Sequence, residues 1–189
     1  MSITSKGVKR RNFWVFGNFL GTFVIFVFER RKCRNNYLIE MRTNKMLVNK
    51  EFKFDAAHLL PNHKGQCKNL HGHTYKLIVT CEGTEQITGT SEGMIMDFSD
   101  LKSIVQTGII DKFDHAFIIG TDSEVEKDVA AVLKKHDLKM LRLEKRSTAE
   151  NIAKYIFSKL KQLLVPYKIR LVEIVLFETS TSFVRCSEE

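Results

Sequence analysis

Two segments of the chain alternate in polarity with the period of a β-strand, and a short loop separates them. In the first segment, one face carries Phe52, Phe54, Ala56 and His58. In the second segment, from His71 to Glu82, one face carries His71, His73, Tyr75, Leu77, Val79 and Cys81. The loop between them contains Pro61 to Gly65, a composition typical of turns. The alternation therefore predicts an antiparallel strand pair with one buried face.

Two helices are predicted after a polar turn and a short strand at residues 94–96. The first begins near Asp97 or Ser99. The second begins at Ser147, where Ser147 and Glu150 have the spacing of a capping box. Its apolar stripe, expected to face the core, consists of Ile152, Ala153, Ile156, Phe157, Leu160, Leu163 and Leu164. The charged segment 122–145 between the helices is expected to be a surface excursion with some helix.

Two further strands are predicted near the C-terminus, from Ile169 to Glu178 and from Ser182 to Cys186. The order of strands and helices indicates an α+β fold. We expect a four-stranded antiparallel sheet with two helices on one face, formed by residues 46–189. Residues 1–45 are interpreted as a separate basic and apolar extension.

The positive charge of the chain is confined to that extension. The net charge is +8, but residues 1–46 contain 10 basic and 2 acidic residues, whereas residues 47–189 contain 20 of each. The body of the protein therefore has no excess of positive charge with which to bind a polyanion. No nucleic-acid partner is expected.

An apolar run within the extension leaves three interpretations open. Residues 13–28 are apolar at 12 of 16 positions and are flanked by basic residues. A spanning helix needs roughly 20 apolar residues, so this run is short for one. It is a membrane anchor, a disordered extension, or sequence upstream of a true start at Met41 or Met46. We expect the third, without membrane contact.

The four cysteines show no C-x-x-C pairing, which indicates a reduced, cytoplasmic protein.

Three histidines on the predicted strand pair form a candidate metal site. His71 and His73 are two residues apart on one strand and therefore point to the same face. Gly72 between them allows close backbone approach, and His58 ends the neighbouring strand. Three imidazoles with one open position are typical of catalytic zinc. The competing interpretation is that these are ordinary polar residues beside a turn.

Cys67 precedes His71 by four residues and has two possible roles. As a fourth ligand it would close the site and make the zinc structural. As a free thiol beside the metal, it would have a depressed pKa and act on a substrate. The spacing leaves both alternatives open.

Two further groups suit proton transfer and ligand binding. In Asp114-His115 the carboxylate can orient the imidazole for proton transfer, although such a dipeptide is often incidental. Glu178 ends an apolar strand face, where a ligand with two N–H donors would satisfy its carboxylate. The alternative is an exposed strand end.

Together these motifs resemble the 6-pyruvoyltetrahydropterin synthase superfamily. The resemblance covers roughly residues 50–186 and rests on Phe54-Asp55-Ala56-Ala57-His58, Cys67-Lys68-Asn69-Leu70-His71-Gly72-His73, Asp97-Phe98, Phe113-Asp114-His115, Ser147-Thr148-Ala149-Glu150-Asn151 and Phe177-Glu178-Thr179. The Cys-x3-His-Gly-His element is similar to the 6-carboxy-5,6,7,8-tetrahydropterin synthase branch of the queuosine (7-deazaguanine) pathway.

The resemblance implies a tunnelling fold, in which subunits assemble into a barrel, usually a homohexamer, with sites at the subunit interfaces. It implies zinc bound by His58, His71 and His73, with Cys67 and the Asp114-His115 dyad transferring protons. Glu178 would anchor the pterin, helped by Thr179 and the backbone of Ser147 and Thr148. The implied substrate is 7,8-dihydroneopterin triphosphate, and the implied products are 6-carboxy-5,6,7,8-tetrahydropterin, acetaldehyde and triphosphate.

Three features depart from the family pattern. Ala116 follows the dyad where a second histidine is often seen, the 122–145 excursion is longer than usual, and residues 1–45 have no counterpart. The alternatives to the carboxy-forming enzyme are the sister 6-pyruvoyltetrahydropterin synthase, a non-catalytic structural zinc protein, and a membrane-attached pterin enzyme.

Overall fold

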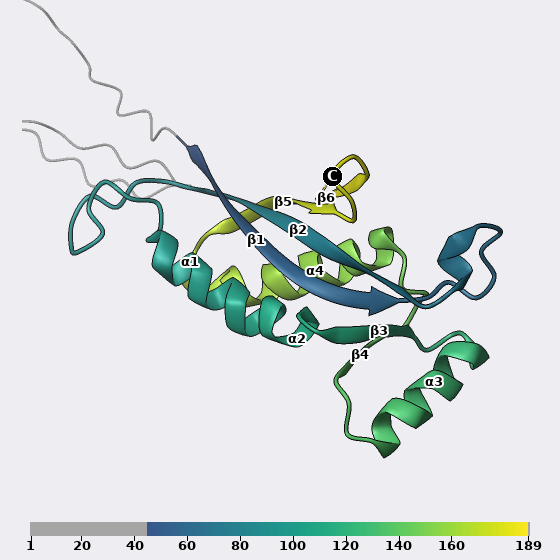
Figure 1. The fold of residues 1–189 in the computed structure, drawn as a ribbon. Helices are drawn as coiled ribbons and strands as arrows, with labels where there is room; N and C mark the ends of the chain where they lie inside the picture. The colour runs from purple at the N-terminus through teal and green to yellow at the C-terminus, as the bar shows by residue number, and fades with distance from the viewer. Residues whose placement is uncertain (1–44, 189) are drawn as a thin grey trace, which may run out of the picture. The chain divides into compact units, whose positions relative to one another are not determined.

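The computed structural model describes residues 45–188, which fold around a six-stranded mixed sheet (Figure 1). Its strands are β1 (Met46–His58), β2 (His71–Gly83), β3 (Ala116–Gly120), β4 (Met140–Leu143), β5 (Arg170–Phe177) and β6 (Phe183–Ser187). Their order in the sheet is β4-β3-β1-β2-β5-β6. The helices are α1 (Phe98–Val105), α2 (Asp111–Phe113), α3 (Glu124–Lys135) and α4 (Ala149–Leu164). A π-helical turn, Gln106–Ile110, joins α1 to α2, and 3-10 turns occur at Gln66–Lys68 and Val165–Tyr167.

The predicted antiparallel pair is confirmed as β1 and β2. Their register sets His58 opposite His71 and Ala56 opposite His73. Gly72 faces Ala57 across the pair, and a methyl group at Gly72 would lie 3.1 Å from the Ala56 carbonyl oxygen. The close approach of the two strands therefore requires a small residue at Gly72.

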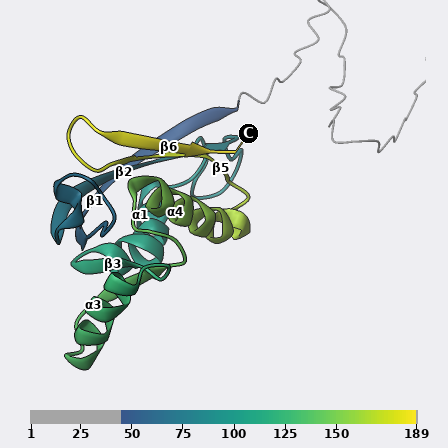
Figure 2. The same ribbon diagram turned by 90° about the vertical axis from the view of Figure 1, so that its right-hand side faces the viewer.

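One face of the sheet is covered by α1 and α4, as both views show (Figures 1 and 2). The predicted core stripe of α4 is buried except for Leu163, which is exposed. The predicted capping box at Ser147 is wrong, because Thr148 caps α4 by accepting from the Asn151 amide. Ser147 is buried and its hydroxyl donates to the Leu59 carbonyl instead, so it is not available to cap the helix.

The prediction of four antiparallel strands is wrong, because β3 and β4 extend the sheet with parallel pairings. In β3, Ala116 pairs with Ala56 of β1, and β4 pairs with β3 along its length. All five residues of β3 are buried, so it shows no alternation by which a strand could be recognised. Residues 94–96, expected to form a strand, form none and bury Ile95 and Met96 in the core instead.

The 122–145 excursion is more ordered than the sequence suggests, because it supplies both α3 and β4. The helix α3 packs on β3 through a small apolar cluster of Leu59, Phe117, Ile119 and Ala130. Its cap is Ser123, whose side chain accepts from the Glu126 amide. In both views α3 lies beyond the β3 side of the sheet (Figures 1 and 2).

Glu126 of α3 is a buried carboxylate and should make stability depend on pH. One carboxylate oxygen accepts from the Gly120 amide, while the other has no partner among the described residues. Burial raises the pKa of Glu126 above 4.5, so the protonated form favours the folded state and stability falls as the pH rises above 4.5. Glu126→Gln should therefore raise the midpoint of thermal unfolding at pH 8 but not at pH 4. Equal effects at both pH values would contradict this account.

None of the helices in residues 45–188 is long and apolar enough to cross a membrane. The apolar run at residues 13–28 and the candidate start at Met41 lie outside the described residues, whereas Met46 begins β1.

Candidate functional site

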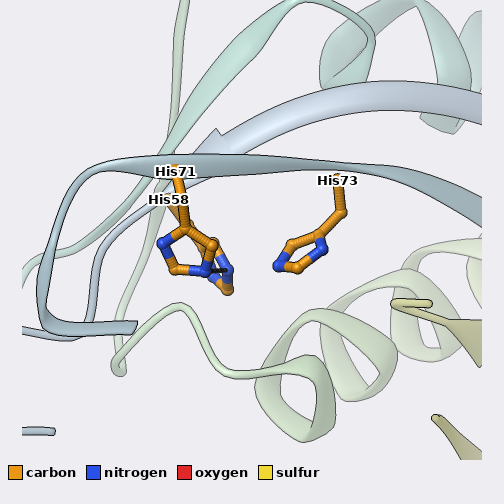
Figure 3. Close-up of side chains that lie close together, drawn as sticks. All are labelled: His58, His71 and His73. Atoms are coloured by element: carbon orange, nitrogen blue, oxygen red, sulfur yellow. Dashed lines mark hydrogen bonds between the residues drawn. The ribbon is translucent and has the colours of Figure 1, made fainter. Parts of the chain in front are cut away.

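The structure brings together the three histidines of the candidate metal site at one end of the β1–β2 pair. Their ligand nitrogens all lie within 4.8 Å of one another, and no other residue of the described range belongs to this group. The His58 ring centroid is 4.5 Å from that of His71 and 5.2 Å from that of His73. Figure 3 shows the His71 and His73 rings on the same side of β2, with the His58 ring beside that of His71. The three side chains therefore converge on a single point.

Backbone carbonyls determine which ring nitrogens are free. His58 Nδ1 donates to the Ser147 carbonyl oxygen at 2.7 Å, and His71 Nδ1 donates to the Asn69 carbonyl oxygen at 2.8 Å. Because each neutral ring then keeps its lone pair on Nε2, both Nε2 atoms are free to bind a metal. These two atoms lie 3.1 Å apart, an arrangement in which the lone pairs repel unless a cation or proton lies between them.

Burial favours the neutral, metal-binding form of two of the three histidines. His58 is only 1% exposed, and desolvation lowers the pKa of His58 and of His73 below 6.5. His73 Nε2 is buried and has no hydrogen-bond partner among residues 45–188. A buried nitrogen without a partner costs free energy that a bound metal would recover. The donor set fits zinc in a three-histidine site with an open position.

Glu178 lies against the histidines rather than at an exposed strand end. It follows β5, whose Phe177 pairs with Lys76 of β2. Its carboxylate oxygen Oε1 is 3.7 Å from His58 Nε2 and 3.9 Å from His73 Nε2. The carboxylate therefore faces the same space as the imidazoles and can receive N–H donors from a ligand bound there.

Cys67 is in the loop between β1 and β2 but does not join the metal cluster. It sits in the 3-10 turn Gln66–Lys68, and its carbonyl accepts from the Leu60 amide at 2.8 Å. Its sulfur is a free, half-buried thiol outside the group of ligand atoms within 4.8 Å. This geometry gives no support to a closed four-ligand site.

Asp114 and His115 pair with one another but not with the histidine cluster. His115 Nδ1 is 2.9 Å from Asp114 Oδ2, and the Asp55 amide donates to Asp114 Oδ1 at 2.9 Å. That backbone bond, and next the His115 ring, keep the pKa of Asp114 low despite partial desolvation. Asp55 holds the dyad through its backbone, because its carbonyl also accepts from the His115 amide, so the dyad lies along the edge of β1. Within one chain, neither Asp114 nor His115 belongs to the group of histidines that could hold a metal.

A groove of about 600 Å³ lies beside the dyad. It is lined by His115 and Lys139, by Asp55, Gly72 and Thr74 from the hairpin, and by apolar side chains from the α3 region such as Leu133 and Leu138. The His115 side chain is 77% exposed there. The imidazole is thus accessible from outside the chain.

Three predicted substrate-binding residues have structural contacts of their own. The Ser147 carbonyl orients His58, and the Thr148 side chain caps α4. Thr179 Oγ1 accepts from the amides of Thr181 and Ser182 and thereby shapes the turn between β5 and β6. The support from Asn69 and Ser147 was not predicted, because backbone carbonyls leave no side-chain signal in a sequence.

Comparison with known proteins gives matches over the same region. A model of the 6-pyruvoyl tetrahydropterin synthase family matches residues 47–189. A 6-carboxy-5,6,7,8-tetrahydropterin synthase of Haemophilus influenzae is 46% identical over 141 residues, covering 75% of this chain and 98% of its own. The protein of that name from Synechocystis is 36% identical over 140 residues, covering 74% of this chain and 91% of its own.

Solved structures share the fold. An uncharacterized protein from Wolinella succinogenes superposes with a TM-score of 0.65 at 21% identity, covering 77% of this chain and 99% of its own. A Caenorhabditis elegans 6-pyruvoyl tetrahydropterin synthase superposes with a TM-score of 0.58 at 24% identity, covering 78% of this chain and 99% of its own. The family match over residues 47–189, the 46% identity and the shared fold show that this chain belongs to the 6-pyruvoyl tetrahydropterin synthase family.

Proposed function

We propose that the protein is a zinc-dependent lyase of queuosine (7-deazaguanine) biosynthesis, a 6-carboxy-5,6,7,8-tetrahydropterin synthase. Its substrate would be 7,8-dihydroneopterin triphosphate, which reacts with one water to give 6-carboxy-5,6,7,8-tetrahydropterin, acetaldehyde and triphosphate. The observation that supports this best is the convergence of three imidazoles, two with Nε2 atoms 3.1 Å apart, in a chain 46% identical to a protein of that name.

His58, His71 and His73 would hold the zinc, which polarises the side-chain oxygens of the bound substrate and acidifies the neighbouring protons. Glu178 would anchor the pterin ring by accepting from two of its N–H groups, because its carboxylate faces the cluster. The nearby backbone of Ser147, Thr148 and Thr179 would border the ring.

Cys67 and the Asp114-His115 dyad would remove and return the protons. Two titratable groups on different sides of a substrate can divide these tasks, which one group cannot do in a single step. In the dyad, Asp114 holds His115 through Nδ1 and leaves Nε2 free to exchange a proton. The cysteine is a free thiol close in sequence to His71 and outside the ligand group, which suits an acid or base rather than a ligand.

The position of the dyad supports an oligomer with shared sites, for which we propose a homohexamer built as a barrel. Asp114 and His115 are outside the histidine group of their own chain, and the His115 side chain is 77% exposed. A dyad from a neighbouring subunit would complete the site.

We also propose a cytoplasmic location, which suits the free thiols Cys67, Cys81 and Cys186.

Product analysis tests the reaction directly. The zinc-loaded protein is incubated with 7,8-dihydroneopterin triphosphate, and acetaldehyde, triphosphate and the pterin product are quantified. We expect acetaldehyde in a one-to-one ratio with the carboxy-pterin. A pyruvoyl product without acetaldehyde would assign the chain to the sister activity, and full zinc occupancy without turnover would favour the structural zinc protein.

A further inference from the structure

His115 has a backbone conformation that its residue type does not favour. Its φ is +59°, in the left-handed region, directly after Asp114, which ends α2. This is the position where helices commonly end with glycine, because a side chain with a Cβ is disfavoured there. A histidine at this position must be held in place by its surroundings, and such outliers cluster at functional sites.

The hairpin holds the dyad from one side. The His115 amide donates to the Asp55 carbonyl at 2.6 Å, and the Asp55 amide donates to Asp114 Oδ1 at 2.9 Å. Asp55 is itself held by Thr74, whose hydroxyl donates to its carboxylate at 2.5 Å. These contacts fix the amide of His115 and the carboxylate of Asp114, but they leave the carbonyls at the end of α2 without partners from the hairpin.

Lys139 holds the dyad from the other side. Its Nζ donates to the Asp111 carbonyl at 2.8 Å and to the Asp114 carbonyl at 2.5 Å. A cation that binds the last carbonyls of a helical segment also interacts favourably with the helix dipole. The lysine backbone is fixed as well, because its carbonyl accepts from the Phe117 amide of β3 at 3.2 Å.

We propose that Lys139 is a positioning residue for the Asp114-His115 dyad, and that the 122–145 excursion serves to present it. The proposal rests on the proton-transfer role given to the dyad under the proposed function. Lys139 acts on the carbonyl of Asp114, one bond from the residue whose strained backbone aims the imidazole. Without its charge, the end of α2 and the His115 backbone would lose one of their two supports.

Three single variants test this role in the acetaldehyde assay. Lys139→Met keeps an unbranched side chain, one atom shorter, but removes the charge and the N–H donors, whereas Lys139→Arg keeps the charge and the donors. Lys135→Met is the matched control, because Lys135 is an exposed lysine at the end of α3. We expect Lys139→Met to lower kcat by about ten- to a hundredfold with KM within about twofold, the effect of a misplaced catalytic group. Lys139→Arg should recover most of kcat, and Lys135→Met should match the wild type.

If Lys139 does not position the dyad, the kcat values of these variants will differ from those expected. An unchanged kcat in Lys139→Met, or an equal loss of kcat in Lys135→Met, would overturn the proposal. Lys139→Gln, which keeps one neutral donor, repeats the test if Lys139→Met does not fold, and an unchanged kcat in that variant would overturn it equally. Zinc content should stay constant throughout, since Lys139 makes no contact with the histidines.

Asp114→Asn separates this proposal from the proposed function. If Asp114→Asn retains wild-type kcat, the dyad has no catalytic role and the proposed mechanism fails. If Asp114→Asn is impaired and Lys139→Met is not, only the role of Lys139 fails. Because Lys139 acts through the backbone that aims the His115 imidazole, Lys139→Met combined with His115→Ala should be no slower than His115→Ala alone, whereas multiplied losses would show an independent role.

Discussion

Replacement of His71 by alanine is expected to release the metal and to lower turnover by about a thousandfold or more. A metal that polarises a substrate oxygen contributes several kcal/mol to transition-state stabilisation, and each ~1.4 kcal/mol is a factor of ten in rate. His71 provides one of the two Nε2 atoms that lie 3.1 Å apart, so its removal leaves an incomplete ligand set. The measurements are metal content by elemental analysis and kcat in the acetaldehyde assay.

His71 is a better position for this test than His58, because its replacement should disturb the fold less. His58 is 1% exposed and bonds the Ser147 carbonyl, so its truncation would leave a buried acceptor without a donor and destabilise the fold. His71 is half-buried, and its carbonyl partner Asn69 lies in the exposed loop. His136→Ala, at the exposed end of α3, is the control and should retain metal and activity. A His71→Ala protein with stoichiometric zinc and normal turnover would refute the metal assignment.

Cys67→Ala is expected to abolish most turnover while the zinc stays bound. Removing a general acid or base costs typically about a hundred- to ten-thousandfold in rate. The sulfur is outside the group of ligand atoms, so its removal leaves His58, His71 and His73 in place. The thiol is half-buried, and its truncation should cost little stability.

Cobalt substitution adds a direct readout of the cysteine's role. If Cys67 were a ligand, the cobalt-loaded protein would show an intense thiolate charge-transfer band, which we expect to be absent. Cys186→Ala, a half-buried thiol on β6, is the matched control and should keep wild-type turnover. Loss of zinc in Cys67→Ala, together with a charge-transfer band in the wild type, would instead support a closed structural site.

Much of the metal cluster could be predicted from the sequence because it depends on local geometry. Residues two apart on a strand share a face in any sheet, so His71 and His73 had to point together. His58 ends the preceding strand, so antiparallel pairing could bring it beside them, and the structure sets His58 opposite His71. The buried stripe of α4 was predictable for the same reason, since helical spacing alone defines a face.

The sheet was predicted less well where strands carry no periodic signal. β3 is buried at all five positions, so its apolar run does not alternate. β4 has four residues within a charged segment, and only its pairing with β3 makes it a strand. The sequence predicted the N-cap of α4 one residue too early, at Ser147. The Ser147 hydroxyl instead donates to the carbonyl of Leu59, which is 88 positions away in the sequence.

The sequence by itself therefore determined which side chains could form the three-histidine cluster, because strand periodicity acts over a few residues. Only the tertiary structure decided how that cluster is supported and what faces it. The Ser147 carbonyl accepts from His58, 89 positions away in the sequence, and Glu178, which follows β5, lies near the same ring. Likewise, only the fold placed Asp114 and His115 beside β1, where the Asp55 amide donates to the Asp114 carboxylate. Such contacts depend on how distant segments pack, and spacing along the chain does not encode that packing.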